Sequence, residues 1–346
     1  MDLKLLKELE NKVSWLSNYI IHNANHLRKK NDDLKVGGHQ ASCASVVSIL
    51  VVLYFKILNK NDRIAVKPHA SPVFHAIQYL LGNQTLNSLK NFRKINGAQA
   101  YPSNTKDNCN VDFSTGSVGL GGAMTIFSSL VQDFLVCNNY LKKKNESKMI
   151  SLFGDAELDE GNVYEALLEG AKHNIKNCWW IIDYNRQSLD GIIHEKLFEK
   201  LIDLFRLMNW DVYILKYGKK LQKLKEKKGG NRILNWIDDC PNDLFSALTF
   251  QGGEGWRKAL SEDFKNDRDV LQIINSINDK ELHEIMTNLA GHDIEELEEV
   301  FSKNRKSSNP TCFICYTVKG FGLPLAGHKD NHSGIMNMDQ FKNYQN

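Results

Sequence analysis

The sequence predicts an α/β protein of three layers, in which a mostly parallel sheet has helices on both faces. Two short apolar runs, residues 149–153 and 178–182, enclose a helical pattern at residues 161–173. A strand, a helix and a strand of these lengths form a βαβ unit, whose strands are parallel. Residues 211–215 and 311–318 are further strand candidates.

Helical patterns account for much of the remaining chain. Apolar residues recur at intervals of three and four near the start, which predicts an amphipathic helix within residues 1–30. After a glycine turn at residues 37–39, a long apolar helix is expected through Val51. The glycine-rich passage 114–123 opens another apolar helix, which is expected to end near Tyr140.

Residues 216–305 are predicted to form a helical, basic insertion before the last strand. Its lysine-rich part, residues 216–232, could be a nucleic-acid patch, but an exposed loop or helix face is the better interpretation. Residues 279–303 are acidic and helical. Because no repeat and no proline-rich linker divides the sequence, we expect residues 1–346 to form one domain.

Composition and charge restrict the class of protein. Hydrophobic residues make up 42% and charged residues 25% of the 346 residues, as in a globular protein. The 44 basic and 41 acidic residues leave a net charge of +3, so neither a nucleic-acid nor a membrane partner is expected. The most apolar stretch, residues 46–55, is far shorter than the roughly 20 residues of a membrane helix.

Cysteine usage and the start of the chain favour a cytoplasmic location. The first residues are charged and lack the apolar core of a signal peptide. The seven cysteines are mostly scattered, which argues against a secreted disulfide framework. Cys312 and Cys315 lie in a strand candidate without a second ligand pair at a zinc-like spacing, so we interpret them as core residues.

Two polar residues follow the two central strand candidates. Asp155 follows Gly154 at the end of the first strand, and Asn185 follows the second strand 30 residues later. In a parallel sheet both side chains reach the same carboxyl edge, where α/β folds bind ligands. A carboxylate and an amide oxygen suit Mg²⁺, which takes its remaining ligands from phosphates and water. The glycine lets a phosphate approach the backbone, and the next helix directs its N-terminus toward negative charge.

Eight motifs in order resemble the N-terminal, diphosphate-binding half of the transketolase superfamily of thiamine diphosphate enzymes. The nearest resemblance is to the homodimeric type of the pyruvate dehydrogenase decarboxylating component, and it covers nearly the whole chain. The motifs are GGHQAS (37–42), KPHASP (67–72), NFR (91–93), AYPS (100–103), TGSVGLG (115–121), GDAELDEG (154–161), DYNRQSLDG (183–191) and VKGFGLPLAGHKDNHSG (318–334).

The resemblance implies a site for thiamine diphosphate and Mg²⁺. The implied metal ligands are Asp155, Asn185 and the main-chain carbonyl of Gln187. Gly154 and the Ala156 amide would face the diphosphate, and the Ser117-Val118 turn would present backbone groups to the aminopyrimidine. The implied cofactor-binding residues are His69, Ser117, Val118, Gly154, Asp155, Ala156 and Asn185.

The resemblance also implies a substrate side. Its residues would be His39, Ser42, Lys67, Tyr101, His328 and His332. Of the histidines, His39, His69 and His332 are the catalytic candidates, since imidazoles donate hydrogen bonds to a developing alkoxide and move protons near neutral pH. Taken singly, each histidine is more often a surface or core residue. Tyr101 could equally be a packing residue, and Glu157, Asp159 and Glu160 could be a helix N-terminal charge cluster.

Three positions depart from the family pattern. Ala156 replaces the second glycine of Gly-Asp-Gly, which is compatible with binding if its dihedral angles accommodate a Cβ. Lys67 stands where pyruvate-type enzymes often have Gln, and its charge could favour an anionic or phosphorylated substrate. Asp183, where the pyruvate type often has Asn, is closer to transketolase.

The resemblance covers only the first of the two domains that build such an active site. We therefore expect a separate chain with the pyrimidine-binding and C-terminal domains, in an assembly with two copies of each chain, or a longer polypeptide. The chain alone is expected to be inactive. Cleavage of a pyruvate-like 2-oxo acid with acyl transfer is the leading function. Transketolase-type ketol transfer between sugar phosphates, with a ketose phosphate as substrate, and a non-catalytic binding module are the alternatives.

Overall fold

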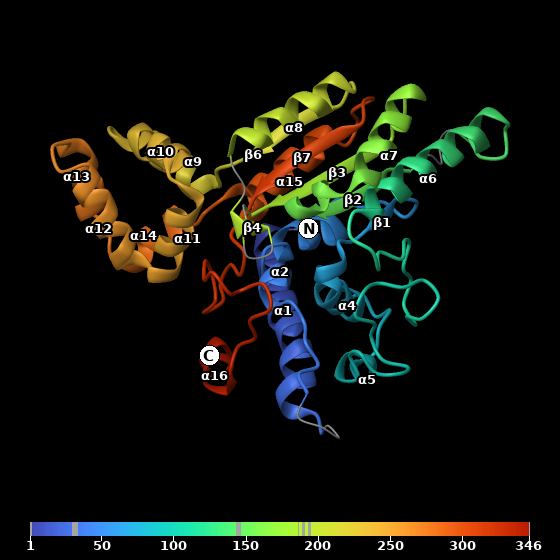
Figure 1. The fold of residues 1–346 in the computed structure, drawn as a ribbon, viewed down its shortest axis with the longest axis horizontal. Helices are drawn as coiled ribbons and strands as arrows, with labels where there is room; N and C mark the ends of the chain where they lie inside the picture. The colour runs from blue at the N-terminus through green and yellow to red at the C-terminus, as the bar shows by residue number, and fades with distance from the viewer. Residues whose placement is uncertain are drawn as a thin grey trace.

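A parallel five-stranded sheet forms the centre of the protein (Figure 1). The computed structural model describes residues 2–29, 34–142, 147–185, 187–188, 191–192 and 195–345. All four neighbouring strand pairs are parallel, in the order β1-β2-β3-β7-β6. The strands are β1 (Arg63–Ala65), β2 (Met149–Gly154), β3 (Cys178–Tyr184), β7 (Thr311–Tyr316) and β6 (Asp211–Leu215). The four strands predicted from sequence are confirmed, whereas the three-residue β1 was not expected.

Alternate side chains of the strands enter two separate cores, so the sheet is covered on both faces. Trp179 and Ile181 of β3 belong to one core, and Trp180 and Ile182 to the other. The first core holds α1 (Leu3–His22), α3 (Val47–Val52), α4 (Ser71–Leu80) and α15 (Ile294–Asn304). The second holds α6 (Leu120–Cys137), α7 (Gly161–Lys172) and α8 (Glu195–Leu207). The predicted three-layer α/β fold is confirmed.

The apolar segment around Val51 differs from its prediction. The expected long helix is divided into α2 (Gln40–Ala44), α3 and the π-helical turn η2 (Leu53–Ile57). The break falls at Ser45, whose hydroxyl donates to the Ser42 carbonyl at 3.0 Å and to Asp183 Oδ2 at 2.8 Å. The next residue, Val46, leaves helical geometry with φ −119° and ψ 5°, beside this polar contact with the centre of the sheet.

The insertion forms a helical group with a third core at one end of the sheet (Figure 1). It contains α9 (Lys219–Lys225), α10 (Gly230–Asp239), α11 (Asn242–Gln251), α12 (Gly253–Asp263), α13 (Arg268–Asn275) and α14 (Asp279–Met286). Residues 279–303 are helical, as expected, but in separate elements: α14 ends at Met286, and η6 (Ala290–His292) precedes α15. Lys219 and Lys220 of the lysine-rich part form ion pairs with neighbouring glutamates, as on an exposed helix face.

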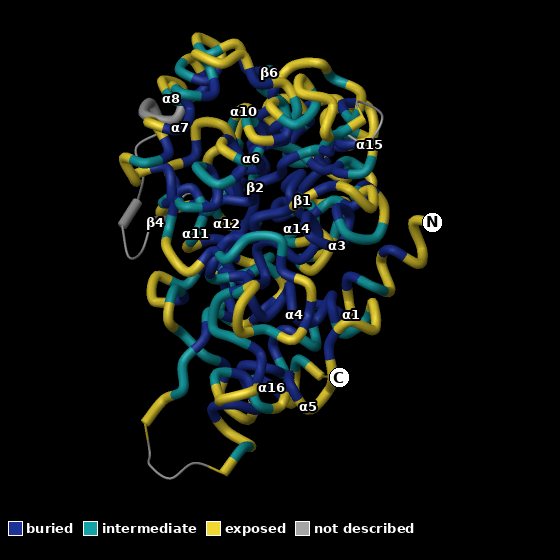
Figure 2. Tube along the Cα trace, turned by 90° about the vertical axis from the view of Figure 1, so that its right-hand side faces the viewer, coloured by how far each residue is buried: buried dark blue, intermediate teal, exposed yellow. Residues whose placement is uncertain are grey.

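Figure 2 shows β2 buried inside a partly exposed outer layer of helices and loops; β3 and β7 are buried as well, whereas the edge strand β6 is mostly half-buried. Cys312 and Cys315 are buried and unpaired in β7, as expected of core residues. Among the described helices, α6 is the one that is long and apolar enough to cross a membrane by length and composition. Its Ile126 is buried in the second core against the sheet, whereas Phe127, Val131 and Phe134 are exposed. The remaining helices are the short α5 (Leu86–Lys90) and α16 (Met338–Gln345).

Candidate active site

The predicted site residues gather at the carboxyl edge of the sheet. Lys67 and His69 follow β1, with His69 in the turn η3 (Pro68–Ala70). Gly154 ends β2, and Asn185 directly follows β3. His332 lies in the loop after β7. This edge is where parallel α/β sheets bind ligands.

Asp155 and Asn185, two of the predicted metal ligands, are joined by a main-chain hydrogen bond. Asp155, in η5 (Asp155–Asp159), accepts hydrogen bonds from the Ala156 N–H at 3.0 Å and the Asn185 N–H at 3.1 Å. Gln187 begins the two-residue strand β4 (Gln187–Ser188), which pairs with β5 (Gly191–Ile192); its side chain lies outside the described residues. The predicted ligands are a carboxylate, an amide oxygen and a main-chain carbonyl, which are oxygen donors of the kind that Mg²⁺ takes.

The turn after β2 combines an unstrained Ala156 with open space beside Gly154. Ala156 lies in η5 and is not among the described non-glycine residues with positive φ, so its methyl group causes no backbone strain. A Cβ on Gly154 would lie 3.8 Å from Lys67 Nζ and 3.8 Å from Glu157 Oε1. The glycine therefore leaves a small space beside an ammonium group. This space next to an ammonium group is compatible with the approach of a phosphate oxygen to the backbone.

Glu157 is a site residue that the sequence did not distinguish from a surface charge. Its carboxylate is buried and accepts hydrogen bonds from the Gly154 and Gly119 N–H groups, each at 2.9 Å. Burial raises the pKa of this carboxyl, although both hydrogen bonds oppose the shift. Glu157 thus joins the end of β2 to the start of α6, where Ser117 is exposed and its carbonyl accepts from Leu120 N–H at 3.4 Å. The predicted Ser117-Val118 turn therefore lies next to the predicted phosphate turn.

Lys67 and Asp183 form a buried ion pair beneath this turn. Lys67 Nζ lies 2.6 Å from Asp183 Oδ2, and both side chains are almost inaccessible to solvent. Thr317 also donates to Asp183, at 2.5 Å, and the Asn185 amide does so at 3.4 Å. Burial would raise the pKa of Asp183, but the Lys67 ammonium and the hydrogen bonds hold it below its usual value. Burial likewise opposes the Lys67 charge, and Asp183 nevertheless raises the pKa of Lys67.

Three of the predicted histidines form a cluster. The ring centroids of His39 and His69 are 4.1 Å apart, and that of His332 lies 5.4 Å and 5.6 Å from them. Tyr101 lies 6.3 Å from His69. Burial, reinforced by neighbouring positive groups, lowers the pKa of His39 to about 4 and that of His69 to about 3. Both imidazoles are therefore neutral near pH 7.

The other expected substrate residues are placed differently. Ser42 is buried in α2, immediately after the His39 turn. His328 lies against α11, where its ring contacts Phe250 at 4.9 Å, and it does not belong to the cluster of three. Lys319, which the sequence did not single out, is buried with its Nζ 3.3 Å from His332 Nδ1. Its position directly before a Gly-Phe-Gly turn in a recognised motif was the available signal.

A basic cavity extends from Tyr101. It has a volume of about 920 Å³ and is lined by Arg93, Lys94 and Lys106 together with backbone and polar groups of residues 95–108. Arg93 has a positive φ of 62° and donates to the Val36 carbonyl at 2.7 Å, which fixes its guanidinium near the glycine turn. The cavity is therefore basic, and Tyr101 is the residue of its lining whose ring lies 6.3 Å from His69.

Comparison with known proteins gives the family. Residues 36–228 match the family model described as transketolase, thiamine diphosphate binding domain, and the chain belongs to this family. The pyruvate dehydrogenase E1 component of Haemophilus influenzae is 26% identical over 332 residues, 92% of this chain and 37% of the relative. That of Escherichia coli K12 is 24% identical over 353 residues, 98% of this chain and 39% of the relative. The chain thus spans little more than a third of these relatives.

Solved transketolase structures share the fold. The transketolase of Campylobacter jejuni superposes with a TM-score of 0.68 at 20% identity, over 100% of this chain and 43% of that one. The transketolase of Leishmania mexicana gives 0.67 at 16% identity, over 98% of this chain and 40% of that one. The resemblance to the diphosphate-binding half of the superfamily, with pyruvate dehydrogenase components as sequence relatives, is confirmed.

Proposed function

We propose that this chain is the diphosphate-binding part of an enzyme that depends on thiamine diphosphate and Mg²⁺, cleaves a pyruvate-like 2-oxo acid and transfers the acyl unit. The main support is the contact between Asp155 and Asn185 at the carboxyl edge of the sheet. The cluster of His39, His69 and His332 lies at the same edge. The bound cofactor would supply the electron sink for bond cleavage. Asp155, Asn185 and the Gln187 carbonyl would hold the metal ion.

The histidines would act on the substrate oxygen. His39 and His69 are neutral near pH 7, so each can donate one hydrogen bond and accept another. A donor placed where negative charge develops stabilises that charge, and a ring nitrogen can move a proton there. Lys319, beside His332, adds a positive charge on the same side. Neutral imidazole rings beside a fixed positive charge can stabilise the negative oxygen that forms when a carbonyl group is attacked.

The Lys67–Asp183 pair bears on the choice of substrate. The charge of Lys67 is matched by Asp183 at 2.6 Å, so these two residues together do not favour a phosphorylated substrate. We therefore keep the 2-oxo acid as the leading substrate. The basic cavity at Tyr101 favours the second candidate, ketol transfer between sugar phosphates, because a ketose phosphate carries more negative charge than pyruvate. A non-catalytic binding module is the third candidate.

We also propose that a separate chain carries the pyrimidine-binding and C-terminal domains, in an assembly with two copies of each chain. The support for these further domains is that the relatives are more than twice as long as the aligned region. Exposed apolar residues provide a contact surface on α6 and α7: Phe127, Val131, Phe134, Tyr164 and Leu168. On this proposal residues 1–346 form one domain, the assembly is cytoplasmic and binds neither nucleic acid nor membrane, and the chain alone is inactive.

The test is a substrate screen on the assembly purified from native cells through this chain. Pyruvate and a ketose phosphate are added separately, and the loss of the cofactor's charge-transfer absorbance is recorded. A response to pyruvate supports the leading function, whereas a response to the sugar phosphate alone supports ketol transfer. Recovery of a longer polypeptide containing this sequence would replace the two-chain arrangement, and an assembly without bound cofactor would favour the binding module.

A further inference from the structure

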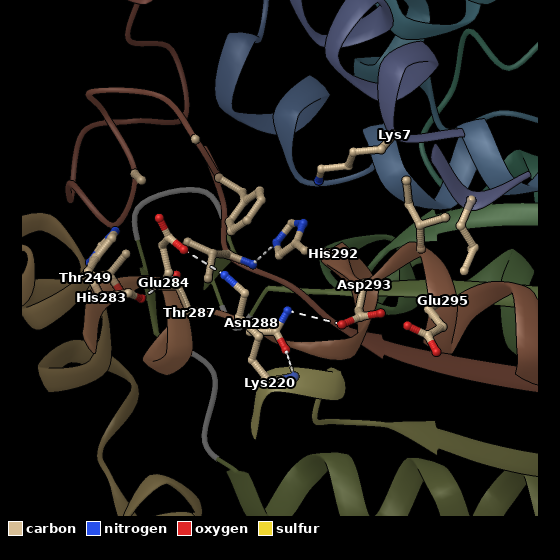
Figure 3. A pocket seen from close by; sticks show the side chains of 16 residues that line it. Lys7, Lys220, Thr249, His283, Glu284, Thr287, Asn288, His292, Asp293 and Glu295 are labelled. Carbon is tan, nitrogen blue, oxygen red and sulfur yellow. Dashed lines mark hydrogen bonds and ion pairs between the residues drawn. The ribbon is translucent and has the colours of Figure 1, made fainter. Parts of the chain in front are cut away.

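A second cavity, of about 570 Å³, lies where the insertion meets α1 and the loop after β7 (Figure 3). Its walls come from the first turns of α1 and α15, from α9, α11 and α14, from η6 and from residues 318–326. None of the predicted cofactor or substrate residues lines it. Its volume lies within the roughly 300–1,000 Å³ typical of small-molecule sites.

His292 gives this cavity an unused hydrogen-bond donor. The Val318 N–H donates to His292 Nε2 at 2.7 Å, and the ring stacks on Phe321 with centroids 3.8 Å apart. Burial lowers the pKa of His292 to about 3, so the ring is neutral and its proton lies on Nδ1. The buried Nδ1 has no hydrogen-bond partner among the described residues. A buried donor without an acceptor lowers the stability of the fold, so we expect an acceptor beside it.

Two further groups make the cavity suitable for a negatively charged oxygen. The Lys7 ammonium reaches from α1 toward the His292 ring, although it also pairs with Glu10 (Figure 3). His283 of α14 contributes a second buried Nδ1 without a partner among the described residues. The Lys7 ammonium and the two imidazole rings thus come from separate elements around one space.

The acidic residues in the wall are already engaged. Asp293 accepts N–H groups from Lys219 at 2.8 Å and Glu296 at 3.1 Å, as the N-cap of α15. Glu284 pairs with Lys220 at 2.7 Å. Glu295 lies in the first turn of α15, where the helix N-terminus offsets its charge. Because their charges are offset by these partners, the carboxylates repel a bound anionic group less strongly than three free carboxylates would.

We propose that this cavity binds a small molecule through a carboxylate or phosphate group that accepts from His292 Nδ1 and faces Lys7. This site is independent of the proposed function. It also adjoins the candidate active site through the chain, because Val318 and Phe321, which hold His292, begin the loop that carries Lys319 and His332. A ligand that fixes His292 would steady this loop, which gives the site a regulatory position.

The test is nuclear magnetic resonance of the full chain with ¹⁵N-labelled histidine, titrated with inorganic phosphate and, separately, with acetate. His292 is assigned by the loss of its signals in His292→Gln. A saturable shift of the His292 Nδ1 signal is expected, with affinity reduced at least fivefold in Lys7→Met. Lys4→Met, on the same helix but outside the cavity, is the matched control and should bind as the unmodified chain does. Response to only one probe would identify the phosphoryl or the carboxylate ligand class.

Two results would overturn the proposal. Shifts confined to His39, His69 and His332 would place the anion at the candidate active site. Equal affinities in the unmodified chain and Lys7→Met would exclude the charge contact. Neither result depends on thiamine diphosphate, so failure of the proposed function and failure of this site are distinguishable.

Discussion

The ammonium of Lys67 lies 2.6 Å from a carboxylate oxygen of Asp183, and the two residues are 116 positions apart in the sequence. These are two of the three positions at which the chain departs from the family pattern expected from its motifs. Their contact means that they act as a unit. A lysine at position 67 without a carboxylate at position 183 would leave a buried charge unpaired, which is strongly unfavourable.

Lys67→Gln and Asp183→Asn should therefore each destabilise the fold, by about 3–5 kcal/mol. The double variant should lose much less than the sum, because it leaves two neutral side chains in the same space. Urea unfolding of the three variants measures the coupling directly. Additive losses would show that the two residues contribute independently.

Gly154 offers a test of the phosphate space. Its backbone, with φ −82° and ψ 152°, is extended, so Gly154→Ala and Gly154→Val should both fold with little change in stability. The valine should reduce affinity for thiamine diphosphate at least tenfold, because its branches fill the space beside Lys67 and Glu157. The alanine should reduce it less. Equal affinities for the cofactor in both variants would place the diphosphate elsewhere.

His69→Ala should lower turnover of the assembled enzyme far more than it lowers stability. The ring lies within the cluster of His39 and His332, so its loss removes a donor from the reacting groups and little core packing. Steady-state kinetics and thermal unfolding on the same preparation separate the two effects. Parallel loss of activity and stability would favour a structural role.

Acid should weaken the fold through the same cluster. In the unfolded chain His69 titrates near its ordinary pKa of 6.5, whereas burial lowers its pKa in the fold to about 3. The unfolded state therefore binds the proton first, and stability falls as the pH decreases from about 6.5 toward 3. At pH 5 the loss from this residue is about 2 kcal/mol.

The measurement is urea unfolding between pH 7.5 and 5, compared with His69→Asn. The free energy of unfolding of the variant should depend less steeply on pH, by a slope that corresponds to at most one proton. An identical slope in both proteins would mean that His69 is protonated in the fold.

The sheet could be predicted from sequence because strands buried on both faces appear as continuous apolar runs. The strand β1 could not, since its three residues, Arg63–Ala65, have no such run. The break beside Ser45 could not be predicted either, since Ser45 bonds to Asp183, which lies far away in sequence.

Within the candidate site, the motifs located the residues but not their surroundings. Glu157 has the sequence context of a surface helix cap, and only the fold shows that its carboxylate is buried between two glycine turns. His328 and His332 are four positions apart in one loop, yet one contacts Phe250 and the other joins the cluster of three. Side-chain direction in an irregular loop depends on tertiary contacts that no spacing rule supplies.

The proposed function depends above all on Asp155 holding the metal ion of a thiamine diphosphate site. The most direct measurement is calorimetric titration of thiamine diphosphate, with and without Mg²⁺, into the assembly purified from native cells and into Asp155→Ala. Asp159→Ala, exposed in the same turn, is the matched control. We expect Mg²⁺-dependent binding of thiamine diphosphate that Asp155→Ala abolishes and Asp159→Ala retains. Unchanged binding in Asp155→Ala would contradict it.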